Sequence, residues 1–197
     1  PGVTEFAIGD RAMTSMGRAA YAERCIVPVE HAARVPDTVD LVSAAAIPLQ
    51  GTTAHYLAHS ASHVEPGDTV LVHAGAGGVG QLLIQLLTAR GVRVIATAST
   101  ESKRELCLNA GAVHAIDYTD FAGAVRSLTN GQGVAAVFDG VGRDTFDQSL
   151  ESLRVRGELV LFGGASGQVP PFDLQRLNSG GSLTVSRPSV IHFLRTP

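Results

Sequence analysis

A glycine-rich segment near the middle of the chain carries the strongest chemical signal. Residues 73–80 read HAGAGGVG, which gives Gly75, Gly77 and Gly80 the spacing GxGxxG. Between a strand and a helix, the first glycine permits a tight turn, the second lets the backbone approach a pyrophosphate, and the third lets helix and strand pack closely. The first N–H groups of the helix and its positive dipole end then hold the phosphates. The spacing therefore predicts a dinucleotide site.

The segment after the next expected strand indicates which dinucleotide is bound. An NAD site usually has an acidic residue about 20 residues past the fingerprint, but Ala98 and Ser99 stand there. The hydroxyls of Ser99 and Thr100 and the ammonium of Lys103, the only lysine in the chain, favour a 2'-phosphate instead. We therefore expect NADP(H). Two alternatives stay open: Glu101 replaces the missing acid, or Ser99 and Thr100 serve only as caps of the following helix.

Metal and hydrolase chemistry have weaker support. His55, His59 and His63 recur every four residues, a spacing with which a helix can present two ligands to one metal. The segment that they span contains no acidic residue or cysteine, and Cys25 and Cys107 form no CxxC pair. The sequence contains no GxSxG nucleophile elbow either. We expect no bound metal, no disulfide framework and no nucleophilic hydrolysis.

Alternating short apolar runs and amphipathic segments from residue 68 onward must position these groups. The first expected helix has Val79, Leu82, Leu83 and Leu86 on one face. Strands buried on both faces and joined by helices predict an α/β fold, a Rossmann doubly wound parallel sheet. The expected strands are 69–73, 93–98, 113–117, 134–139, 158–163 and 182–186, and the helices between the first five begin near Val79, Ser102, Asp120 and Asp144.

The first 48 residues differ, because short apolar stretches are broken by turn signals. They predict irregular β structure, too short for a sandwich or barrel of its own. The alanine-rich segment 41–61 predicts a helix that is interrupted near Pro48 and Gly51.

Composition narrows the partners and the location. The chain has 197 residues, a net charge of -3 and scattered basic residues, so we expect no nucleic-acid partner. No apolar run reaches the ~18 residues of a membrane-spanning helix, and no signal segment is visible, so we expect no membrane and a cytoplasmic location. The chain begins without methionine and ends just after an apolar stretch. We expect it to be a piece of a longer protein.

Several motifs in a fixed order extend the prediction to a family. They are GDRA at Gly9, AYAERCIVP at Ala20, AAAIPLQGTTAHYL at Ala44, PGDTVLVHAGAGGVG at Pro66, GAVHAIDY at Gly111, FDGVGRDTF at Phe138, LFGGASG at Leu161 and GSLTVSRPS at Gly181. The chain thereby resembles the NADPH:quinone oxidoreductase, zeta-crystallin-like branch of the medium-chain dehydrogenase/reductase superfamily. The resemblance implies a remnant of a GroES-like catalytic β domain in residues 1–49, a Rossmann NADP-binding domain in 50–190, and the start of a return to the catalytic domain in 191–197.

The resemblance also implies cofactor contacts beyond the three fingerprint glycines. Gly78 and Val79 would lie beside the pyrophosphate, and Gln50 stands where zinc-dependent relatives have a catalytic cysteine, which implies a zinc-independent enzyme. Gly75 departs from the alanine or serine usual in the branch, and we expect this change to leave phosphate binding intact. The other implied contacts are Thr53 and Tyr56, then Ser99, Thr100 and Lys103 around the 2'-phosphate, Tyr118 and Gly140 at the adenosine side, and Phe162, Gly163, Gly164, Ala165, Pro188, Ser189 and Val190 at the nicotinamide.

The implied activity of the parent protein is hydride transfer from NADPH to a quinone or a similar electron-poor carbonyl acceptor. No catalytic residue is identified in this chain, because it reads mainly as the cofactor-binding part. One alternative is an NADPH-dependent enoyl or alkenal reductase, and another is an isolated fragment that binds NADPH without catalysis. The resemblance further implies a homodimer, with the strand expected at 182–186 as the candidate pairing edge.

Overall fold

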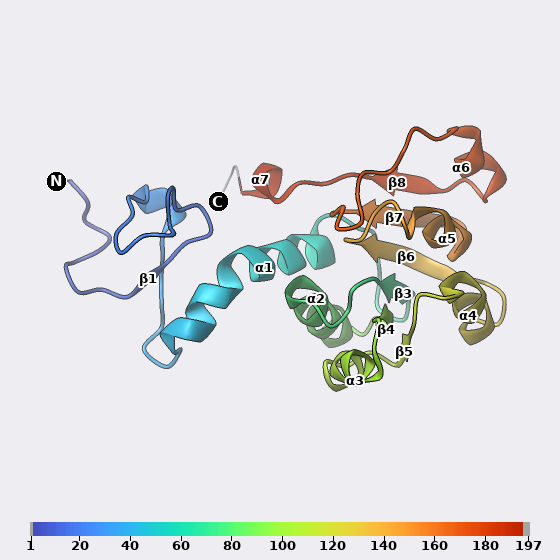
Figure 1. Ribbon diagram of the computed structural model, residues 1–197, viewed down its shortest axis with the longest axis horizontal. Coiled ribbons are helices and arrows are strands. Elements are labelled where there is room, and N and C mark those ends of the chain that lie inside the picture. The colour runs from blue at the N-terminus through green and yellow to red at the C-terminus, as the bar shows by residue number, and fades with distance from the viewer. Residues whose placement is uncertain (1, 195–197) are drawn as a thin grey trace. The chain divides into compact units, whose positions relative to one another are not determined.

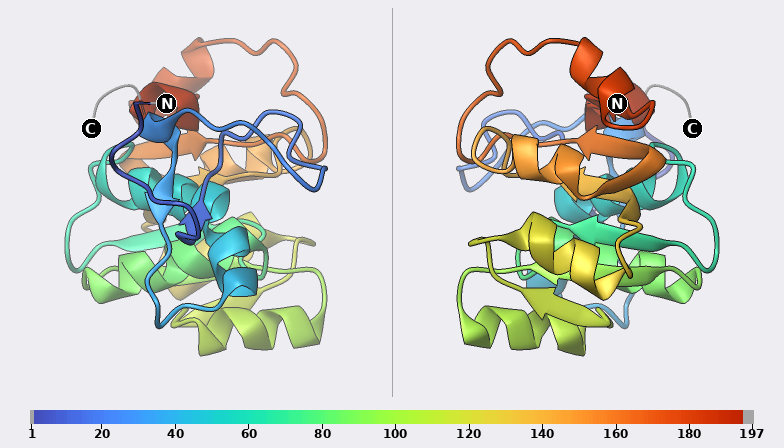
Figure 2. Two further views of the ribbon diagram at one scale, coloured as in Figure 1. Left: turned by 90° about the vertical axis from the view of Figure 1, so that its left-hand side faces the viewer. Right: turned by 90° about the vertical axis from the view of Figure 1, so that its right-hand side faces the viewer.

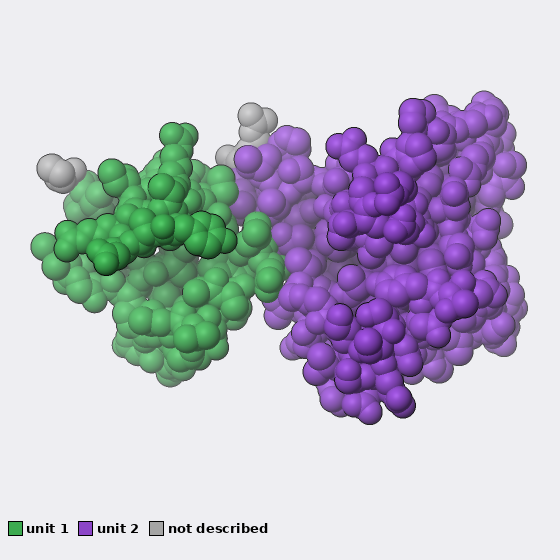
Figure 3. Space-filling view, in the orientation of Figure 1, with its two compact units in different colours: residues 1–52 green, residues 53–197 purple. Residues whose placement is uncertain are grey.

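The structure is a computed structural model that describes residues 2–194. The chain divides into two compact units, Pro1–Thr52 and Thr53–Pro197, which Figure 3 colours separately. The predicted return segment 191–197 is described only as far as Leu194, and residues 195–197 lie outside the described part. The predicted domain boundaries stay predictions.

The first unit contains little regular structure, as its turn signals predict. Strands β1 (Ala12–Met13) and β2 (Ala33–Arg34) pair antiparallel, and a single 3-10 turn, η1 (Val29–His31), precedes β2 (Figure 1). Its assignment as a remnant of a GroES-like domain stays a prediction.

Helix α1 (Leu41–His59) begins in the first unit and ends in the second. The carboxylate of Asp40 caps its start, since Oδ1 accepts hydrogen bonds from the N–H groups of Val42 at 3.0 Å and Ser43 at 2.9 Å. The predicted interruption near Pro48 and Gly51 is wrong, because the helix runs through both residues. A proline removes one backbone donor, and here that loss does not break the helix.

The second unit is built on a six-stranded sheet with the order β5-β4-β3-β6-β7-β8, and all its strands are parallel (Figures 1 and 2). Strand order reverses between β3 and β6, so the predicted doubly wound Rossmann sheet is confirmed. The strands are β3 (Thr69–Val72), β4 (Arg93–Thr97), β5 (His114–Ile116), β6 (Val134–Asp139), β7 (Leu153–Leu161) and β8 (Thr184–Ser186). The helices are α2 (Gly78–Ala89), α3 (Glu101–Asn109), α4 (Phe121–Leu128), α5 (Phe146–Glu151), α6 (Gln175–Ser179) and α7 (Val190–Phe193).

Each face of the sheet has its own hydrophobic core. Val70 and Val72 pack with the end of α1, α2 and α3 on one face, whereas Leu71 packs with α4 and α5 on the other. This alternation follows from the two-residue period of a strand. The carboxyl ends of β3 and β6 meet where the strand order reverses, and ligands of such sheets bind at that edge.

Strand β7 departs most from its predicted bounds, because it begins at Leu153 rather than near Glu158. Its pairing with β6 jumps from Val134↔Leu153 to Ala136↔Glu158, and Arg156 takes a positive φ of 62° in the extra loop of chain. This bulge places charged side chains within the strand, which hides its first half from a hydrophobic pattern. None of the helices in residues 2–194 has the length and apolar character needed to cross a membrane.

Candidate functional site

The turn between β3 and α2 has the form that its glycines predict. The N–H of Gly75 donates to the carbonyl of Thr97 at 2.9 Å, and the N–H of Gly77 donates to the carbonyl of Ala74 at 2.9 Å. Gly77 is the N-cap of α2 and supplies no side-chain cap. Because the first N–H groups of a helix lack partners within the helix, those of Gly78 and Val79 are available to an anion.

Gly80 and Gly75 lie too close together for a side chain at position 80. A Cβ on Gly80 would lie 2.7 Å from the Cα of Gly75, and backbone atoms there cannot move aside cheaply. Only hydrogen fits, so the third fingerprint glycine brings α2 against the turn as predicted.

Gly75 is confined by side chains rather than by backbone. A Cβ at this position would lie 2.8 Å from Sγ of Cys107 and 2.9 Å from Cβ of Ala96. Cys107 is fully buried, and burial raises the pKa of its thiol. The alanine or serine that the branch usually carries at position 75 would therefore require its neighbours to shift.

We expect Gly75→Ala to lower the free energy of unfolding by about 2 kcal/mol, because overpacking a filled core forces its neighbours to move. Adding Cys107→Ala removes the nearest sulfur and should restore about half of that loss. Urea unfolding of the two variants, of Cys107→Ala alone and of the unmodified chain forms the complete cycle. A double variant no more stable than the sum of both single losses would show that Cys107 is not the limiting neighbour.

A cavity of about 210 Å³ opens beside this turn. Ser99, Lys103 and Tyr118 line it together, and its remaining lining residues are Ala74, Ala76, Gly77 and Ala98. The ammonium of Lys103 has no carboxylate within ion-pair distance in residues 2–194. The cavity thus combines two hydroxyls with one uncompensated cation.

Thr100 occupies a different position from the one implied for it. It is the N-cap of α3, its Oγ1 accepts a hydrogen bond from the N–H of Lys103 at 3.3 Å, and it does not line the 210 Å³ cavity. Glu101 is the exposed first residue of α3 and does not line the cavity either. The capping alternative therefore describes Thr100, while Ser99 remains in the cavity.

A second cavity, of about 460 Å³, lies at the other end of the same sheet edge. Thr53, Tyr56, Phe162, Pro188, Ser189 and Val190 line it, all of them residues that the resemblance implies at the nicotinamide side or at the end of α1. Arg187 lines it too and is a residue that the sequence reasoning missed. Its guanidinium donates to the carbonyl of Leu161 at 3.0 Å. Its position directly before Pro188 in SRPS was the available signal.

Tyr56 forms a rigid part of this second cavity. Its ring is nearly buried and stacks on Phe193 with ring centroids 4.4 Å apart. Burial raises the pKa of Tyr56, and the charge of Arg187 opposes that rise. The phenol therefore stays protonated at neutral pH and can donate a hydrogen bond.

Four small residues in the loops after β6 and β7 support Phe162 and do not line a cavity themselves. A Cβ on Gly140 would lie 2.9 Å from Cζ of Phe162, so the ring packs directly on the Gly140 backbone. Gly163 and Ala165 tie the two loops together, since their N–H groups donate to the carbonyls of Asp139 at 3.3 Å and Gly140 at 3.2 Å. Gly164 belongs to the same loop. None of these four small residues lines either cavity.

A buried histidine at the turn between β3 and α2 was also missed by the sequence analysis. His73 is 1% exposed; its Nδ1 lies 2.9 Å from Oγ1 of Thr97, and its Nε2 lies 3.0 Å from Oγ of Ser149. Burial lowers the pKa of His73 from its usual 6.5 to about 4, against an opposing effect of the Asp139 carboxylate. The sequence gives no sign that His73 is buried and hydrogen-bonded on both ring nitrogens, because a histidine after a strand is common.

The predicted absence of a metal is not contradicted by the described residues. The rings of His55 and His59 lie 4.6 Å apart, whereas Nδ1 of His63 lies 3.2 Å from a carboxylate oxygen of Glu158. Residues 2–194 contain no group of three histidine, cysteine, aspartate or glutamate side chains arranged to hold an ion.

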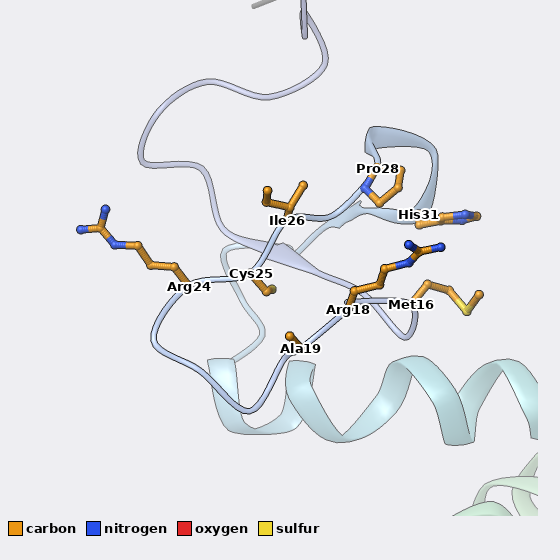
Figure 4. Close-up of a pocket in the computed structure, with 8 residues that line it drawn as sticks. All are labelled: Met16, Arg18, Ala19, Arg24, Cys25, Ile26, Pro28 and His31. Atoms are coloured by element: carbon orange, nitrogen blue, oxygen red, sulfur yellow. The ribbon is translucent and has the colours of Figure 1, made fainter.

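The first unit has a cavity of its own, of about 730 Å³ (Figure 4). In Figure 4 the side chains of Met16 and Arg18 lie on the side of His31, whereas Arg24 points away from it. No residue of the predicted dinucleotide site lines this cavity. We assign it no chemistry.

Comparison with known proteins places this arrangement in a family. The family model described as "Zinc-binding dehydrogenase" matches residues 78–195, more than half of the chain. The chain belongs to the zinc-binding dehydrogenase family. The resemblance to the quinone oxidoreductase branch of the medium-chain dehydrogenase/reductase superfamily is thereby confirmed, since named relatives carry that description.

Three relatives of this family member illustrate the range of the similarity. A probable quinone oxidoreductase of Schizosaccharomyces pombe is 44% identical over 96% of this chain and 57% of that protein. A 2-haloacrylate reductase of Burkholderia is 41% identical over 98% of this chain and 60% of that protein. A mycobacterial protein solved in complex with NADPH is 54% identical, superimposes with a TM-score of 0.96, and is covered to 62% by the whole of this chain. The chain thus spans about 60% of the length of the relatives it matches.

The zinc-binding dehydrogenase family takes its name from members with a metal that this chain's residues do not favour. Gln50 occupies the position at which the resemblance implies a catalytic cysteine in zinc-dependent members. An amide is a poor zinc ligand beside thiolate and imidazole. The family model matches α2 and the part of each cavity wall that follows it in sequence, which includes Lys103 in one cavity and Arg187 in the other.

Proposed function

We propose that this chain binds NADP(H) along the carboxyl edge of its parallel sheet. The observation that carries the proposal is the start of α2, which has no side-chain cap and packs against the turn because position 80 is glycine. On the two sides of it lie a cavity that contains Lys103 and a cavity that contains Arg187. A dinucleotide needs this order of features, since its pyrophosphate joins two nucleosides that extend in opposite directions.

The adenosine end is proposed to lie in the 210 Å³ cavity, with its 2'-phosphate beside Ser99 and Lys103. A phosphate gains from a cation and hydroxyl donors more than a neutral ribose hydroxyl does. The nicotinamide end is proposed to lie in the 460 Å³ cavity, where Phe162 and Val190 provide apolar walls and Arg187 a positive charge. The NADPH complex of the mycobacterial relative supports this choice of cofactor.

Lys103→Ala tests the choice of cofactor. We expect the variant to bind NADPH about 10- to 100-fold more weakly than the unmodified chain, because a charge-assisted hydrogen bond contributes roughly 1.5–3 kcal/mol. Its affinity for NADH should stay within about twofold, since NADH has no 2'-phosphate. Calorimetric titration of both nucleotides into both proteins measures the four constants.

Two control variants sharpen the Lys103 experiment. Lys103→Arg keeps the charge and should retain most of the preference, and Arg93→Ala removes one positive charge at the amino end of β4, away from both cavities. Equal affinity of the unmodified chain for NADPH and NADH would contradict the NADP(H) assignment. Absence of binding to both would contradict the dinucleotide site itself.

We propose further that the parent protein is a zinc-independent oxidoreductase that reduces a quinone or a similar electron-poor carbonyl compound. Bound NADPH supplies the hydride. The chain's own residues would orient the cofactor and exclude water from the 460 Å³ cavity, and Arg187 would favour the negative charge that develops on the acceptor oxygen. The quinone oxidoreductase relative supports this acceptor class.

The 2-haloacrylate reductase relative favours a second candidate, the reduction of an activated carbon–carbon double bond by an enoyl or alkenal reductase. A parallel assay of NADPH oxidation by the parent protein, with a simple quinone and with 2-chloroacrylate, separates the two. The third alternative concerns this chain as an isolated fragment: tight NADPH binding without turnover by this chain would support a binding module without catalysis, and robust turnover by it would eliminate that alternative.

Assembly and location complete the proposal. Strand β8 lies at an edge of the sheet, and an open edge can pair with a second copy through backbone hydrogen bonds. A homodimer joined at β8 is therefore proposed from the sheet order and the resemblance, and light scattering of the chain checks it. The cytoplasmic location expected from the sequence is kept as a proposal.

A further inference from the structure

Five buried polar side chains gather directly beneath the turn between β3 and α2. This turn is proposed to hold the pyrophosphate and is called the phosphate turn below. The five side chains come from the carboxyl ends of three neighbouring parallel strands and from α5 with its N-cap. They are His73, Thr97, Asp139, Thr145 and Ser149, and none is more than 2% exposed. Buried polar groups are stabilising only when all are paired, and such a network usually fixes one arrangement of the core.

Hydrogen-bond donors within this cluster can be assigned from its acidic end. Oδ2 of Asp139 accepts from the hydroxyls of Thr145 at 2.7 Å and Ser149 at 3.1 Å. Because the only hydroxyl hydrogen of Ser149 is used there, its oxygen accepts from His73, and so Nε2 of His73 carries the hydrogen. Nδ1 of His73 is then the acceptor for the hydroxyl of Thr97. One tautomer of His73 satisfies the whole chain of bonds.

The ring of His73 also supports a wall of the adenosine cavity. The centroid of its ring lies 6.0 Å from the centroid of the Tyr118 ring, and the two planes are 21° apart. The centroid of the Phe121 ring lies 4.7 Å away, and that ring meets His73 edge-on. The hydroxyl of Tyr118 accepts a hydrogen bond from the N–H of Ala74 at 2.9 Å. Ala74 has a positive φ of 51°, which is uncommon for a residue other than glycine, so this bond helps to hold an unfavourable backbone.

We propose that His73 is a positioning residue of the dinucleotide site: held as its Nε2–H tautomer by the chain of bonds from Thr97 to Asp139, it fixes Tyr118 against Ala74. The inference rests on the proposed function, since the position of Tyr118 matters only if a nucleotide lies beside it. His73 itself is buried and acts through Tyr118 rather than on the ligand.

Asp139, at one end of this row of hydrogen-bonded side chains, supports the second cavity. Oδ1 of Asp139 accepts from the N–H groups of Val141 at 2.8 Å and Gly142 at 3.0 Å, which fixes the turn after β6. Phe162 packs on Gly140 in this turn and lines the 460 Å³ cavity. One set of buried hydrogen bonds therefore sets the walls at both ends of the proposed cofactor site.

A double-mutant cycle on the full chain tests the inference, with NADPH affinity as the readout. We expect Tyr118→Phe and His73→Phe each to weaken NADPH binding about tenfold, since each disturbs the same wall. If His73 acts through Tyr118, the double variant should bind within about twofold of the weaker single variant. Losses that multiply, or unchanged affinity in His73→Phe, would overturn the proposal.

Two further variants keep the test decisive if His73→Phe fails to fold. Thr97→Val removes only the hydroxyl that bonds Nδ1 and should weaken NADPH binding about threefold or more. Ser152→Ala is the matched control. The hydroxyl of Ser152 is buried and donates to the Gln148 carbonyl at 2.8 Å, and it takes no part in the hydrogen bonds from Thr97 to Asp139. It should lower stability without altering affinity. Equal affinities of Thr97→Val and Ser152→Ala would overturn the proposal.

Heteronuclear NMR of the ligand-free chain supplies a readout that a merely structural role would not move. We expect a slowly exchanging proton on Nε2 of His73 and none on Nδ1. A proton found on Nδ1 and not on Nε2 would overturn the assignment. If the unmodified chain binds no NADPH, the proposed function fails. If it binds NADPH and the variants bind equally well, only the role of His73 fails.

Discussion

Alanine at position 80 is expected to abolish NADPH binding. The added Cβ would lie 2.7 Å from the Cα and 2.8 Å from the carbonyl carbon of Gly75, so either α2 or the phosphate turn must move. Both movements displace the N–H groups of Gly78 and Val79, which are proposed to hold the pyrophosphate. We expect at least a 100-fold loss of NADPH affinity and a loss of about 2 kcal/mol in the free energy of unfolding. Calorimetric titration and urea unfolding measure the two effects.

Two glycines serve as graded controls for position 80. A Cβ on Gly17 in the first unit would meet Cβ of Ala20 at an ordinary 3.4 Å, so Gly17→Ala should change neither measurement. A Cβ on Gly77 would lie 3.2 Å from the Ala74 carbonyl oxygen, and Gly77→Ala should lie between the two extremes. Retention of NADPH affinity within threefold by Gly80→Ala would show that the ligand does not use this turn.

Local patterns predicted the Rossmann sheet because each of its signals acts over a few residues. The apolar runs of β3 and β6 are buried within the sheet, as predicted. In α2 the predicted stripe places Leu83 in the core, whereas its other members, Val79, Leu82 and Leu86, are only partly buried. Ile84 and Leu87 complete the buried face of the helix. Such features need no knowledge of distant contacts. The start of β7 depends on a bulge, which a local hydrophobic pattern does not reveal. Helix α1 continues through Pro48, although proline usually marks a helix end in a sequence pattern.

The sequence analysis named the residues of the candidate site that belong to a sequence motif. It missed those whose part in the site depends on contacts between distant segments. Lys103 and Tyr118 reach one cavity because the turns after β4 and β5 meet at the same sheet edge, which the fold class implies. The capping role of Thr100 was stated as an alternative, and the structure shows it. The partners of His73 come from positions 24 and 76 residues away in sequence. Only the folded sheet brings them together.

Acid is expected to destabilise the second unit through His73. Burial lowers the pKa of His73 from 6.5 to about 4, so the folded chain takes up its proton later than the unfolded chain as the pH falls. The stability that the uncharged ring contributes is complete above pH 6.5 and is lost as the pH falls toward 4. At about 1.4 kcal/mol for each pKa unit, the loss amounts to roughly 3 kcal/mol.

His73→Gln separates this loss from that of other groups. Asp139 and Tyr118 are the titratable side chains that face His73, and Thr97, Ser149 and Phe121 are its uncharged neighbours. Glutamine cannot take up a proton, so the variant should be less stable at pH 7 but lose about 3 kcal/mol less than the unmodified chain on acidification to pH 4. Urea unfolding at half-unit steps of pH measures both slopes. Parallel slopes would mean that the imidazole takes up its proton at an ordinary pH, and then the buried chain from Thr97 to Asp139 would not hold His73 as a single uncharged tautomer.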